Sequence, residues 1–571
     1  MKAAFKAAFK RSTYKRERVE IMKSSRIASL LISLTLILII LSGCSSGNSG
    51  NTYTTSQSKK ITDTKEVYAQ DNDEMKDVYV TIVKENTVTM KQVDAWQFNS
   101  GTTKPEIYVR LDYDKPAEDV DGVKANAVLG QRGHWASTSY LKSYKIKLDK
   151  SAEKWEGQDV LNLNKHPDDI TRLRNKLCFD LIKMFPDTFS CRTQFCHLYV
   201  RDLNSSDVSY ADYGLFTHVE DIGKNYFKSR NINKNPYLYK AKNFDFLMHP
   251  DVIKNVKDPG YNKAEFEKML EIEGPEDHTR LIEMLKAVND ENQDINDVID
   301  KYFDRDNYVT WLALNLLLTN TDTHVANFYL MSPADQNKWY FMTWDYDLST
   351  NFNYELAFES DQYTISYMTC GVSMYWGVPL HRRFLQDPNN VKELTAKIEE
   401  LSKIATDKVV ADKVDKYYSL TSGLVKSNPD KLMMNAPVSV YESEVQNLKK
   451  AVDYGKTTYY EGLKMPMPFT LNEVKAEGGS YKFSWGKSYD FDGDSLKYDL
   501  FISRTPYFED VVQQKLNLKD TSAVIKSLKP GTYYWKVEAV DPAGNRQGGL
   551  GLYYDQAEDL DFFSIRKLVV N

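Results

Sequence analysis

The amino-acid sequence predicts an α+β protein that ends in an all-β domain. Three observations indicate this class. Alternating apolar residues typical of strands open the folded part, helical spacing follows from about residue 262 to residue 318, and strand-like alternation returns after about residue 466. The chain has 571 residues, which is enough for several folding units at a prior of roughly 150 residues each.

The composition is that of a globular protein, with 42% hydrophobic, 27% charged and 13% aromatic residues. It excludes collagen-like, coiled-coil and wholly disordered classes. The formal net charge is −6, but residues 1–43 contain nine Lys or Arg and two Glu, which leaves −13 for the remainder. An acidic body argues against a nucleic-acid polymer as partner, because the phosphate backbone attracts basic surfaces.

Residues 1–43 are predicted to form a signal peptide with a bacterial lipobox. Fifteen uncharged residues, 27–41, run directly into Ser-Gly and Cys44. This run is shorter than the roughly 18–20 residues of a spanning helix, and a plain membrane anchor is the alternative interpretation. Met22 is an alternative start. A lipid on Cys44 would hold the protein at the extracellular face of the cell membrane.

Residues 44–70 are rich in Ser, Gly, Asn and Thr, which predicts a flexible tether. The folded part is expected to divide into residues 71–465 and 466–571. The remaining cysteines are Cys178, Cys191, Cys196 and Cys370, without a CxxC pair. This spacing predicts at most one or two disulfides in an exported protein and does not favour a zinc site.

Strands are predicted at residues 77–83, 106–111, 127–129, 144–148, 197–200 and 213–219. In the strand 144–148, alternation places Tyr144 and Ile146 on one face, with Lys145 and Lys147 on the other. A helix is expected to start at Pro167 and to run to about residue 185.

The helical part ends in Asp322, followed five residues later by Asn327, a strand at residues 328–331 and a hairpin that leads to Asp345 and Asp347. Phosphoryl transfer needs a carboxylate that accepts the proton of a hydroxyl, oxygen ligands for Mg²⁺ and cations for the phosphates. The step from Asp to Asn equals that of the protein-kinase catalytic loop, although neither H-R-D nor D-F-G is present. The order of parts therefore predicts a kinase-like domain with two lobes.

Residues about 77 to 400 resemble the spore-coat protein H (CotH) kinase family in several motifs that occur in the family's order. The motifs are Arg132-Gly133, Lys142-Ser143-Tyr144-Lys145-Ile146-Lys147, Leu173-Arg174-Asn175-Lys176-Leu177, Tyr213-Gly214-Leu215-Phe216-Thr217-His218-Val219-Glu220, Tyr237-Leu238-Tyr239-Lys240-Ala241, Asn320-Thr321-Asp322 with Asn327-Phe328-Tyr329-Leu330, and Trp344-Asp345-Tyr346-Asp347-Leu348. The resemblance implies an atypical secretory kinase that transfers phosphate from ATP to Ser or Thr of exported proteins, with Asp322 as the catalytic aspartate and Asp345 as a metal ligand.

The candidate site residues fall into three groups. They are Asp322 and Asn327 for catalysis, Arg132, Lys142, Lys145, Lys147, Glu220 and Lys240 for the nucleotide, and Asn327, Asp345 and Asp347 for Mg²⁺ or Mn²⁺. Among the three lysines around the strand 144–148, we favour Lys147, the last position that faces the site. One of Asp345 and Asp347 is expected to be structural.

Several assignments stay open at this point. The family's Arg-Gly-Asn-Ser loop is replaced after Gly133 by His134-Trp135-Ala136-Ser137, which leaves its phosphate contacts in question. Glu220 either binds an adenine amine or pairs with Lys224. Lys240 faces either phosphate or solvent. The helix after the lysine strand has no Glu, so Asp169, Asp180 and Arg174 are its candidates to interact with the lysine.

The segment after residue 466 resembles a fibronectin type III domain. Strands are expected at residues 481–485, 496–503, 523–525 and 531–541, at the spacing of a β-sandwich. Residues 490–494 have the carboxylates of a calcium loop but not its glycine position or closing Glu, so a hairpin turn is the favoured interpretation. Such a domain predicts a role in binding a partner or in spacing the other domain, without chemistry of its own.

The sequence thus predicts an exported, membrane-anchored protein kinase that uses ATP with Mg²⁺ or Mn²⁺ on secreted, surface or spore-coat proteins. The first alternative is a catalytically inactive scaffold with the same fold, which the altered Arg-Gly loop and the missing helix Glu favour. The second is transfer of AMP from ATP, because an altered phosphate loop permits a reversed nucleotide.

Overall fold

The computed structural model describes most of the chain from Lys60 onward. The described residues are 60–69, 71–98, 100–116, 120–232, 235–350, 371–434, 436–556 and 560–571. The expected signal peptide, Cys44 and Cys370 lie outside these ranges. Residues Lys60–Tyr553 and Phe562–Asn571 form one compact unit.

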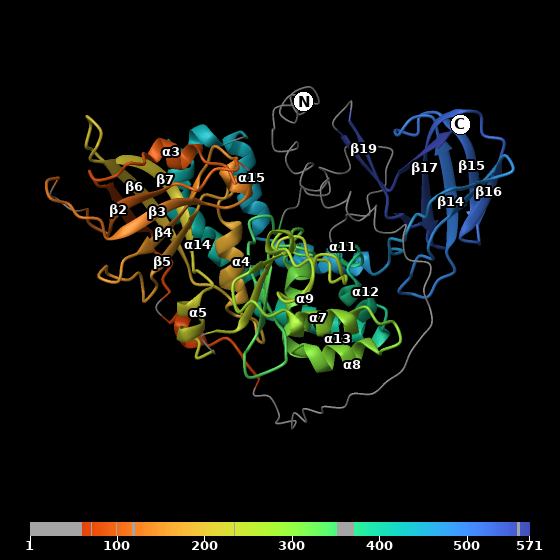
Figure 1. The fold of residues 1–571 in the computed structure, drawn as a ribbon, viewed down its shortest axis with the longest axis horizontal. Helices are drawn as coiled ribbons and strands as arrows, with labels where there is room; N and C mark the ends of the chain where they lie inside the picture. The colour runs from red at the N-terminus through yellow and green to blue at the C-terminus, as the bar shows by residue number, and fades with distance from the viewer. Residues whose placement is uncertain are drawn as a thin grey trace. The chain divides into compact units, whose positions relative to one another are not determined.

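A closed barrel of seven strands begins the folded part, and its strands run from orange to yellow in Figure 1. The strands are β1 (Lys76–Ile82), β2 (Glu106–Tyr113), β3 (Ala127–Arg132), β4 (Ser143–Leu148), β5 (Val160–Asn164), β6 (Thr193–Asp202) and β7 (Ala211–Val219). Their order is β1-β2-β3-β4-β5-β7-β6, and the parallel pair β1 and β6 closes the ring. Closure removes the unpaired strand edges that an open sheet would expose.

Strand alternation decides which side chains fill the barrel. Val80 of β1 and Ile146 of β4 are fully buried in the apolar cluster of the barrel. Lys145, the neighbour of Ile146, therefore points outward, as the sequence predicts. It lies opposite Gly130 of β3 and Asn162 of β5, and these three positions share the outer face.

The predicted strands of this part are confirmed, and five of the six are longer than expected. β6 has ten residues and β7 has nine, whereas the sequence pattern covered only part of each. The strand β5 was not predicted, because its short segment Val-Leu-Asn-Leu-Asn carries a weak apolar pattern.

The helix α4 (Arg174–Ile182) begins seven residues after the predicted start at Pro167. The side chain of Asp169 accepts hydrogen bonds from the backbone N–H groups of Thr171 and Arg174, at 2.9 Å each. Such a local side-chain bond competes with helix formation, so Asp169 forms a turn before the helix. All nine residues of α4 are buried.

A second sheet follows, with the strand order β11-β10-β8-β9. Its strands are β8 (Tyr237–Ala241), β9 (Leu270–Ile272), β10 (Phe328–Ser332) and β11 (Tyr340–Thr343), and neighbouring strands are antiparallel. The predicted hairpin at residues 328–347 is confirmed as β10 and β11. Leu270 was expected in a helix, but it pairs with Ala241 of β8 in β9.

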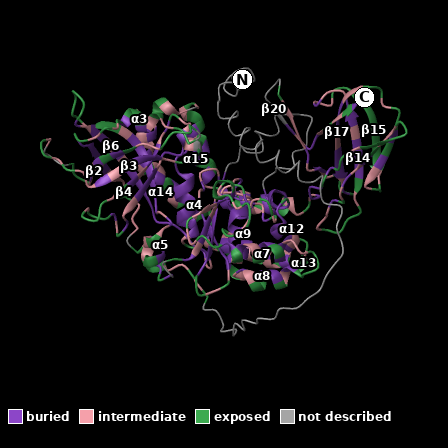
Figure 2. Ribbon diagram, in the orientation of Figure 1, coloured by how far each residue is buried: buried purple, intermediate pink, exposed green. Residues whose placement is uncertain are grey.

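Helices form the rest of this part. They are α3 (Met90–Ala95), α5 (Lys224–Ser229), α6 (Lys263–Phe266), α7 (Thr279–Val288), α8 (Ile295–Tyr302), α9 (Arg305–Leu317), α11 (Val372–Tyr375), α12 (Pro379–Leu385), α13 (Pro388–Ile404), α14 (Asp407–Val425), α15 (Val438–Leu448) and α16 (Ala451–Gly462). α9 is buried along nearly its whole length, and Figure 2 shows it in the colour of buried residues. It leads directly into the loop that contains Asp322.

The C-terminal domain is a β-sandwich of two sheets. One has the order β12-β13-β16, and the other has the order β15-β14-β17-β18 with β21 also on β17. The strands are β12 (Lys475–Glu477), β13 (Ser480–Ser484), β14 (Lys497–Ser503), β15 (Val511–Leu518), β16 (Ser522–Lys526), β17 (Gly531–Val540), β18 (Arg546–Gly548) and β21 (Arg566–Val570). The strands β19 (Leu552–Asp555) and β20 (Leu560–Phe563) pair as a separate two-stranded sheet. The four predicted strands are confirmed as β13, β14, β16 and β17. Tyr533 donates a hydrogen bond to the Lys529 carbonyl at 2.8 Å, as the tyrosine of a sandwich corner does.

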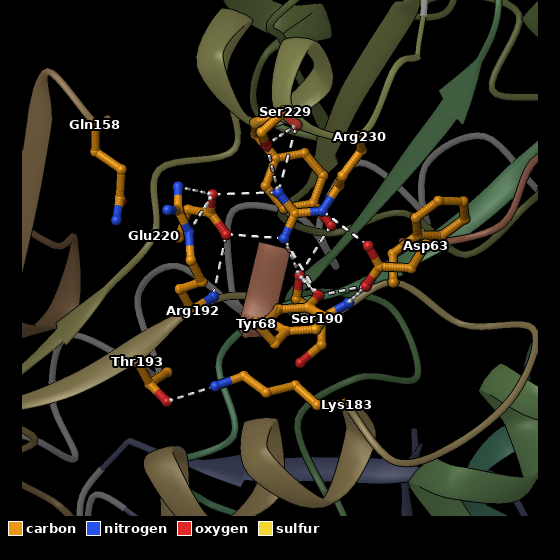
Figure 3. Close-up of polar contacts among 12 residues, drawn as sticks. Asp63, Tyr68, Gln158, Lys183, Ser190, Arg192, Thr193, Glu220, Ser229 and Arg230 are labelled. Carbon is orange, nitrogen blue, oxygen red and sulfur yellow. Dashed lines mark hydrogen bonds and ion pairs between the residues drawn. The ribbon is translucent and has the colours of Figure 1, made fainter. Parts of the chain in front are cut away.

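The segment Lys60–Ala69 packs against the α+β part, although the sequence predicted a flexible tether up to residue 70. Asp63 is almost fully buried and forms an ion pair with the buried Arg230 at 2.9 Å. Tyr68, in the short 3₁₀ helix Lys65–Tyr68, donates a hydrogen bond to the Ser190 carbonyl at 2.9 Å. Figure 3 shows Arg230 between Asp63 and Glu220. The ordered domain therefore begins before residue 71.

Candidate functional site

The loop between α9 and β10 brings the two predicted catalytic residues together. The Asn327 side-chain amide donates a hydrogen bond to Asp322 Oδ2 at 2.5 Å. Asn327 has a left-handed backbone with φ of 55°, and its N–H donates to the Ala241 carbonyl of β8 at 3.1 Å. The neighbouring strand thus fixes Asn327, and Asn327 fixes the carboxylate of Asp322.

Asp345 and Asp347 follow β11 and lie close enough to influence each other. Asp345 has a left-handed backbone with φ of 58°, so the chain turns there and does not continue as an extended strand. Burial and the charge of Asp347 raise the pKa of Asp345 to about 6. Burial and the charges of Asp168, Asp169 and Asp322 raise the pKa of Asp347 to about 8. The carboxylates therefore crowd around one site.

Two of the predicted cations face these carboxylates. The Arg132 guanidinium lies 5.8 Å from the centre of the Trp344 ring, and the Lys240 ammonium lies 5.2 Å from the same ring. Burial lowers the pKa of Lys240 and of Arg132, and Asp345 opposes that lowering for both groups. Lys240 thus extends toward Trp344 and Asp345 and does not point away into solvent. Arg132 also donates a hydrogen bond to the side-chain oxygen of Asn164 in β5.

Lys145 has a carboxylate partner that the sequence did not reveal. Its ammonium lies 2.8 Å from Asp221 Oδ1, and the Asn162 side chain donates to the same oxygen at 3.1 Å. Burial alone would raise the pKa of Asp221, but Lys145 outweighs it and the net change is a lowering. Asp221 follows β7 and also interacts with the charge of Arg132. Lys145 therefore belongs to the group around Arg132.

The three candidate partners on and before α4 are engaged elsewhere. Asp169 forms an ion pair with Arg174 at 2.5 Å, and Arg174 also reaches Glu444 at 2.8 Å. Asp180 pairs with Lys176 at 2.7 Å and with Lys183 at 2.5 Å. These pairs are buried, so they stabilise the position of α4.

The structure does not bring Lys142 and Lys147 into the group around Asp345. The Lys147 ammonium forms an ion pair with Glu106 at 3.0 Å, and its side chain is 54% exposed. Lys142 donates to the Ser137 carbonyl at 2.7 Å. The preference for Lys147 over Lys145 as the phosphate ligand therefore finds no support in the geometry.

Glu220 takes neither of the two roles that the sequence left open. It is 1% exposed and forms ion pairs with Arg192 at 2.7 Å and with Arg230 at 2.9 Å (Figure 3). Burial would raise its pKa, but the two guanidinium groups outweigh burial and hold the pKa at about 2. Removal of one partner from such a buried pair typically costs about 3–5 kcal/mol. Glu220 therefore links strand β7 to the N-terminal segment through Arg230.

Sequence reasoning missed several residues of the site, namely His166, Asn175, Asp221, Asn162 and Asn164. Asn175 lies within the motif at residues 173–177, and that motif is the signal that could have pointed to it. The others are separated in sequence from their partners by large distances, such as 181 residues between His166 and Asp347. Local patterns contain no information about such pairs.

Asp345, Asp347 and Asn327 carry oxygen atoms of the kind that Mg²⁺ and Mn²⁺ prefer as ligands. Within the described ranges, no three His, Cys, Asp or Glu side chains converge closely enough to hold a metal by themselves. Mg²⁺ in phosphoryl-transfer sites is usually held by one or two carboxylates together with phosphates and water. Asp345 and Asp347, whose crowded charges a cation would neutralise, fit that pattern, and the Asn327 amide oxygen is a third hard donor.

Two further observations concern the cysteines and the membrane. Cys178, Cys191 and Cys196 are buried free thiols, so among these three no disulfide forms. In the part of the chain that the structure covers, no helix has the length and apolar character of a membrane span.

The fold and the site together define an α+β protein with a closed barrel, a second sheet and a charged site of carboxylates and cations. The chain belongs to the CotH kinase protein family, whose family model matches residues 129–458. The resemblance inferred from the sequence is thereby confirmed. The match starts within β3 and ends within α16, so it leaves β1 and β2 of the barrel outside.

Two other comparisons concern curated proteins and solved structures. A search of curated proteins gave no match. Among solved structures, the chain is similar to an Fn3-like protein from Clostridium thermocellum, with 17% sequence identity, a TM-score of 0.12, and coverage of 15% of this chain and 82% of the other.

Proposed function

We propose that this protein is an atypical protein kinase that transfers the γ-phosphate of ATP to Ser or Thr hydroxyl groups of proteins. One observation supports this function above all others. The hydrogen-bonded pair Asp322 and Asn327 lies beside the carboxylates Asp345 and Asp347, whose site also holds the cations Arg132 and Lys240. We further propose that the barrel and the helical part correspond to the two lobes of a kinase.

In this proposal each residue has a defined task. The substrate hydroxyl oxygen forms a bond to the γ-phosphorus, the bond from that phosphorus to the bridging oxygen of ADP breaks, and Asp322 accepts the hydroxyl proton. Arg132, Lys240 and Lys145 bind phosphate oxygens, because cations stabilise the charge that spreads over them. Asp345, Asp347 and Asn327 would hold Mg²⁺ or Mn²⁺, which would neutralise negative charge on the phosphates.

The proposed substrates are secreted, surface or spore-coat proteins, and the proposed location is the extracellular face of the cell membrane with a lipid on Cys44. The family supports the substrate class, and the sequence of residues 1–44 supports export and anchoring.

The test is intact mass spectrometry of the full-length protein and of added casein after incubation with ATP and Mg²⁺ or Mn²⁺. We expect the mass of one or more phosphoryl groups on casein or on the protein itself. Asp322→Asn should lower the rate about 10²-fold or more, which is typical for loss of a general base. Asp345→Asn should also lose transfer.

The control variant is Asp306→Asn on the exposed surface of α9, where the carboxylate is 61% exposed and forms a surface ion pair with Lys60 at 2.5 Å, at the end of the helix that is away from Asp322. It should transfer phosphate like the wild type. If AMP groups are added instead of phosphoryl groups, the protein is an AMP transferase with the same fold. Absence of any transfer, with the wild type folded, would favour a binding scaffold.

A further inference from the structure

His166 lies beside Asp347 in a strained and buried position that the sequence did not mark. It follows β5, is 3% exposed and has a left-handed backbone with φ of 49°. Its Nδ1 lies 3.3 Å from Asp347 Oδ2, and its Nε2 lies 3.3 Å from Asn175 Nδ2. The imidazole thus connects α4 to the chain after β11.

The hydrogen bonds of Asn175 decide which ring nitrogen of His166 carries the hydrogen. The Tyr346 backbone N–H donates to Asn175 Oδ1 at 3.1 Å. A backbone N–H can only donate, so the Asn175 oxygen must face Tyr346 and its NH₂ group must face His166. His166 Nε2 therefore accepts a hydrogen bond and bears no hydrogen. In a neutral ring the hydrogen is then on Nδ1, which donates to Asp347.

A charged imidazole does not fit this arrangement. Both ring nitrogens of the imidazolium are donors, and one of them would face the donating NH₂ of Asn175. The ring is therefore a neutral donor toward Asp347.

We propose that His166 is a positioning residue for Asp347: held as the Nδ1–H tautomer by Asn175 and the Tyr346 backbone, it fixes the orientation of one carboxylate oxygen of Asp347 toward a divalent cation. This inference rests on the proposed function. Residues that orient metal ligands typically contribute about 10–100-fold to metal affinity.

The surrounding backbone fixes the position of the ring. The Arg172 guanidinium donates hydrogen bonds to the His166 carbonyl and, at 2.9 Å, to the Asp169 carbonyl. His166, Arg172, Asn327 and Asp345 all have φ between 49° and 60°. Left-handed non-glycine residues of this kind gather where the surrounding structure holds a functional geometry.

Two substitutions test the roles of the two ring nitrogens separately. In His166→Asn the side-chain NH₂ can occupy the place of Nδ1–H and donate to Asp347. In His166→Gln the NH₂ reaches the place of Nε2, so the bond to Asp347 is lost while a polar side chain of similar size remains. Because Asn adopts the left-handed backbone of His166 more readily than Gln does, the Mn²⁺ affinities of the two variants are compared under conditions in which both are folded.

The experiment uses the full-length protein and has two readouts that do not require transfer. The first is long-range ¹H–¹⁵N NMR of ¹⁵N-histidine-labelled protein at neutral pH, with the His166 signals assigned by their loss in His166→Asn. The second is Mn²⁺ binding by electron paramagnetic resonance, with and without ATP. We expect the Nδ1–H tautomer for His166, Mn²⁺ affinity within about threefold of wild type for His166→Asn, and a loss of about 10–100-fold for His166→Gln.

Each outcome decides the inference. An Nε2–H tautomer, equal Mn²⁺ affinity of the two folded variants, or absence of Mn²⁺ binding by the wild type would overturn it. Thermal unfolding confirms that the variants are folded. If Mn²⁺ binding follows the expected pattern but casein gains no phosphate, the inference stands and the proposed kinase function fails. If casein is phosphorylated but His166→Gln binds Mn²⁺ like the wild type, the kinase function stands and the inference about His166 fails.

Discussion

Lys145 and Lys147 are two positions apart on strand β4 and share its outer face, yet their surroundings differ. Lys145 forms a half-exposed ion pair with Asp221 in the group around Arg132, whereas Lys147 pairs with Glu106 at the surface. Alternation along a strand fixes the face of a residue but not its neighbours. The preference for Lys147 rested on its being the last position on that face of the strand.

The two lysines offer a matched test. Lys145→Met should raise the KM for ATP about tenfold or more, because a hydrogen bond to a charged group contributes about 1.5–3 kcal/mol. Lys147→Met should change it less than about twofold, since exposed ion pairs contribute about 0–1 kcal/mol. Steady-state kinetics with casein measure both. Equal effects of the two variants would contradict the assignment.

The residues of the site divide according to how far apart their partners are in the sequence. Asp322 and Asn327 were predictable, because a fixed local step places them in one loop, and the structure shows their hydrogen bond. Asp221 was not predictable, because its partner Lys145 is 76 residues away and the sheet register decides the pair. His166 was missed for the same reason.

At the level of elements, the packing of two helices holds the catalytic loop. Gly455 of α16 lies against the end of α9: a Cβ built there would be 1.9 Å from the Leu317 carbonyl oxygen. Leu317 is the last residue of α9, and Asp322 follows five residues later. The close approach of these helices thus sets where the loop begins.

This contact gives a second matched test. Gly455→Ala should lower the free energy of unfolding by about 1–3 kcal/mol, because the added methyl group overpacks a rigid backbone contact. It should also reduce phosphate transfer, since α9 must shift. Gly423→Ala, within α14 and with nothing within 4 Å of its Cβ, should raise stability by about 0.5–1 kcal/mol. Denaturant unfolding measures both, and equal stability of the two variants would disprove the role of the close contact.

Strands were predicted correctly where one buried face gave a clear alternation of apolar and polar residues. The strands β1 to β4 and the sandwich strands alternate because one face packs on a core. The start of α4 was placed too early because Asp169 uses its carboxylate for a turn and an ion pair with Arg174. The short strand β9 was taken as helical because three residues do not define a period.

In the α+β part, the carboxylates around Asp345 and Asp347 repel one another. Burial and the charge of Asp347 raise the pKa of Asp345, whereas burial and the charges of Asp168, Asp169 and Asp322 raise the pKa of Asp347. Binding of ATP with Mn²⁺ to the folded state should stabilise it by about 2.7 kcal/mol at a ligand concentration of about 100 times Kd.

The measurement is the Tm of the full-length protein with and without ATP and Mn²⁺. We expect a rise of a few degrees in the wild type. Asp345→Asn should have a Tm at least as high without ligand, because one of the repelling charges is gone, and it should show no rise with ligand. A ligand-induced rise that persists in this variant would contradict the role of Asp345.

The sequence by itself determined the α+β class, the sandwich at the C-terminal end, the family and the loop that contains Asp322 and Asn327, because these depend on local period, turn residues and short ordered motifs. Only the tertiary structure decided that the barrel closes, that Lys145 pairs with Asp221, that Glu220 is held by Arg192 and Arg230, and that His166 lies beside Asp347. The physical reason is the same in each case. Charge pairs and hydrogen bonds between distant segments form when apolar packing brings their elements together, and the local pattern of either segment does not encode its partner.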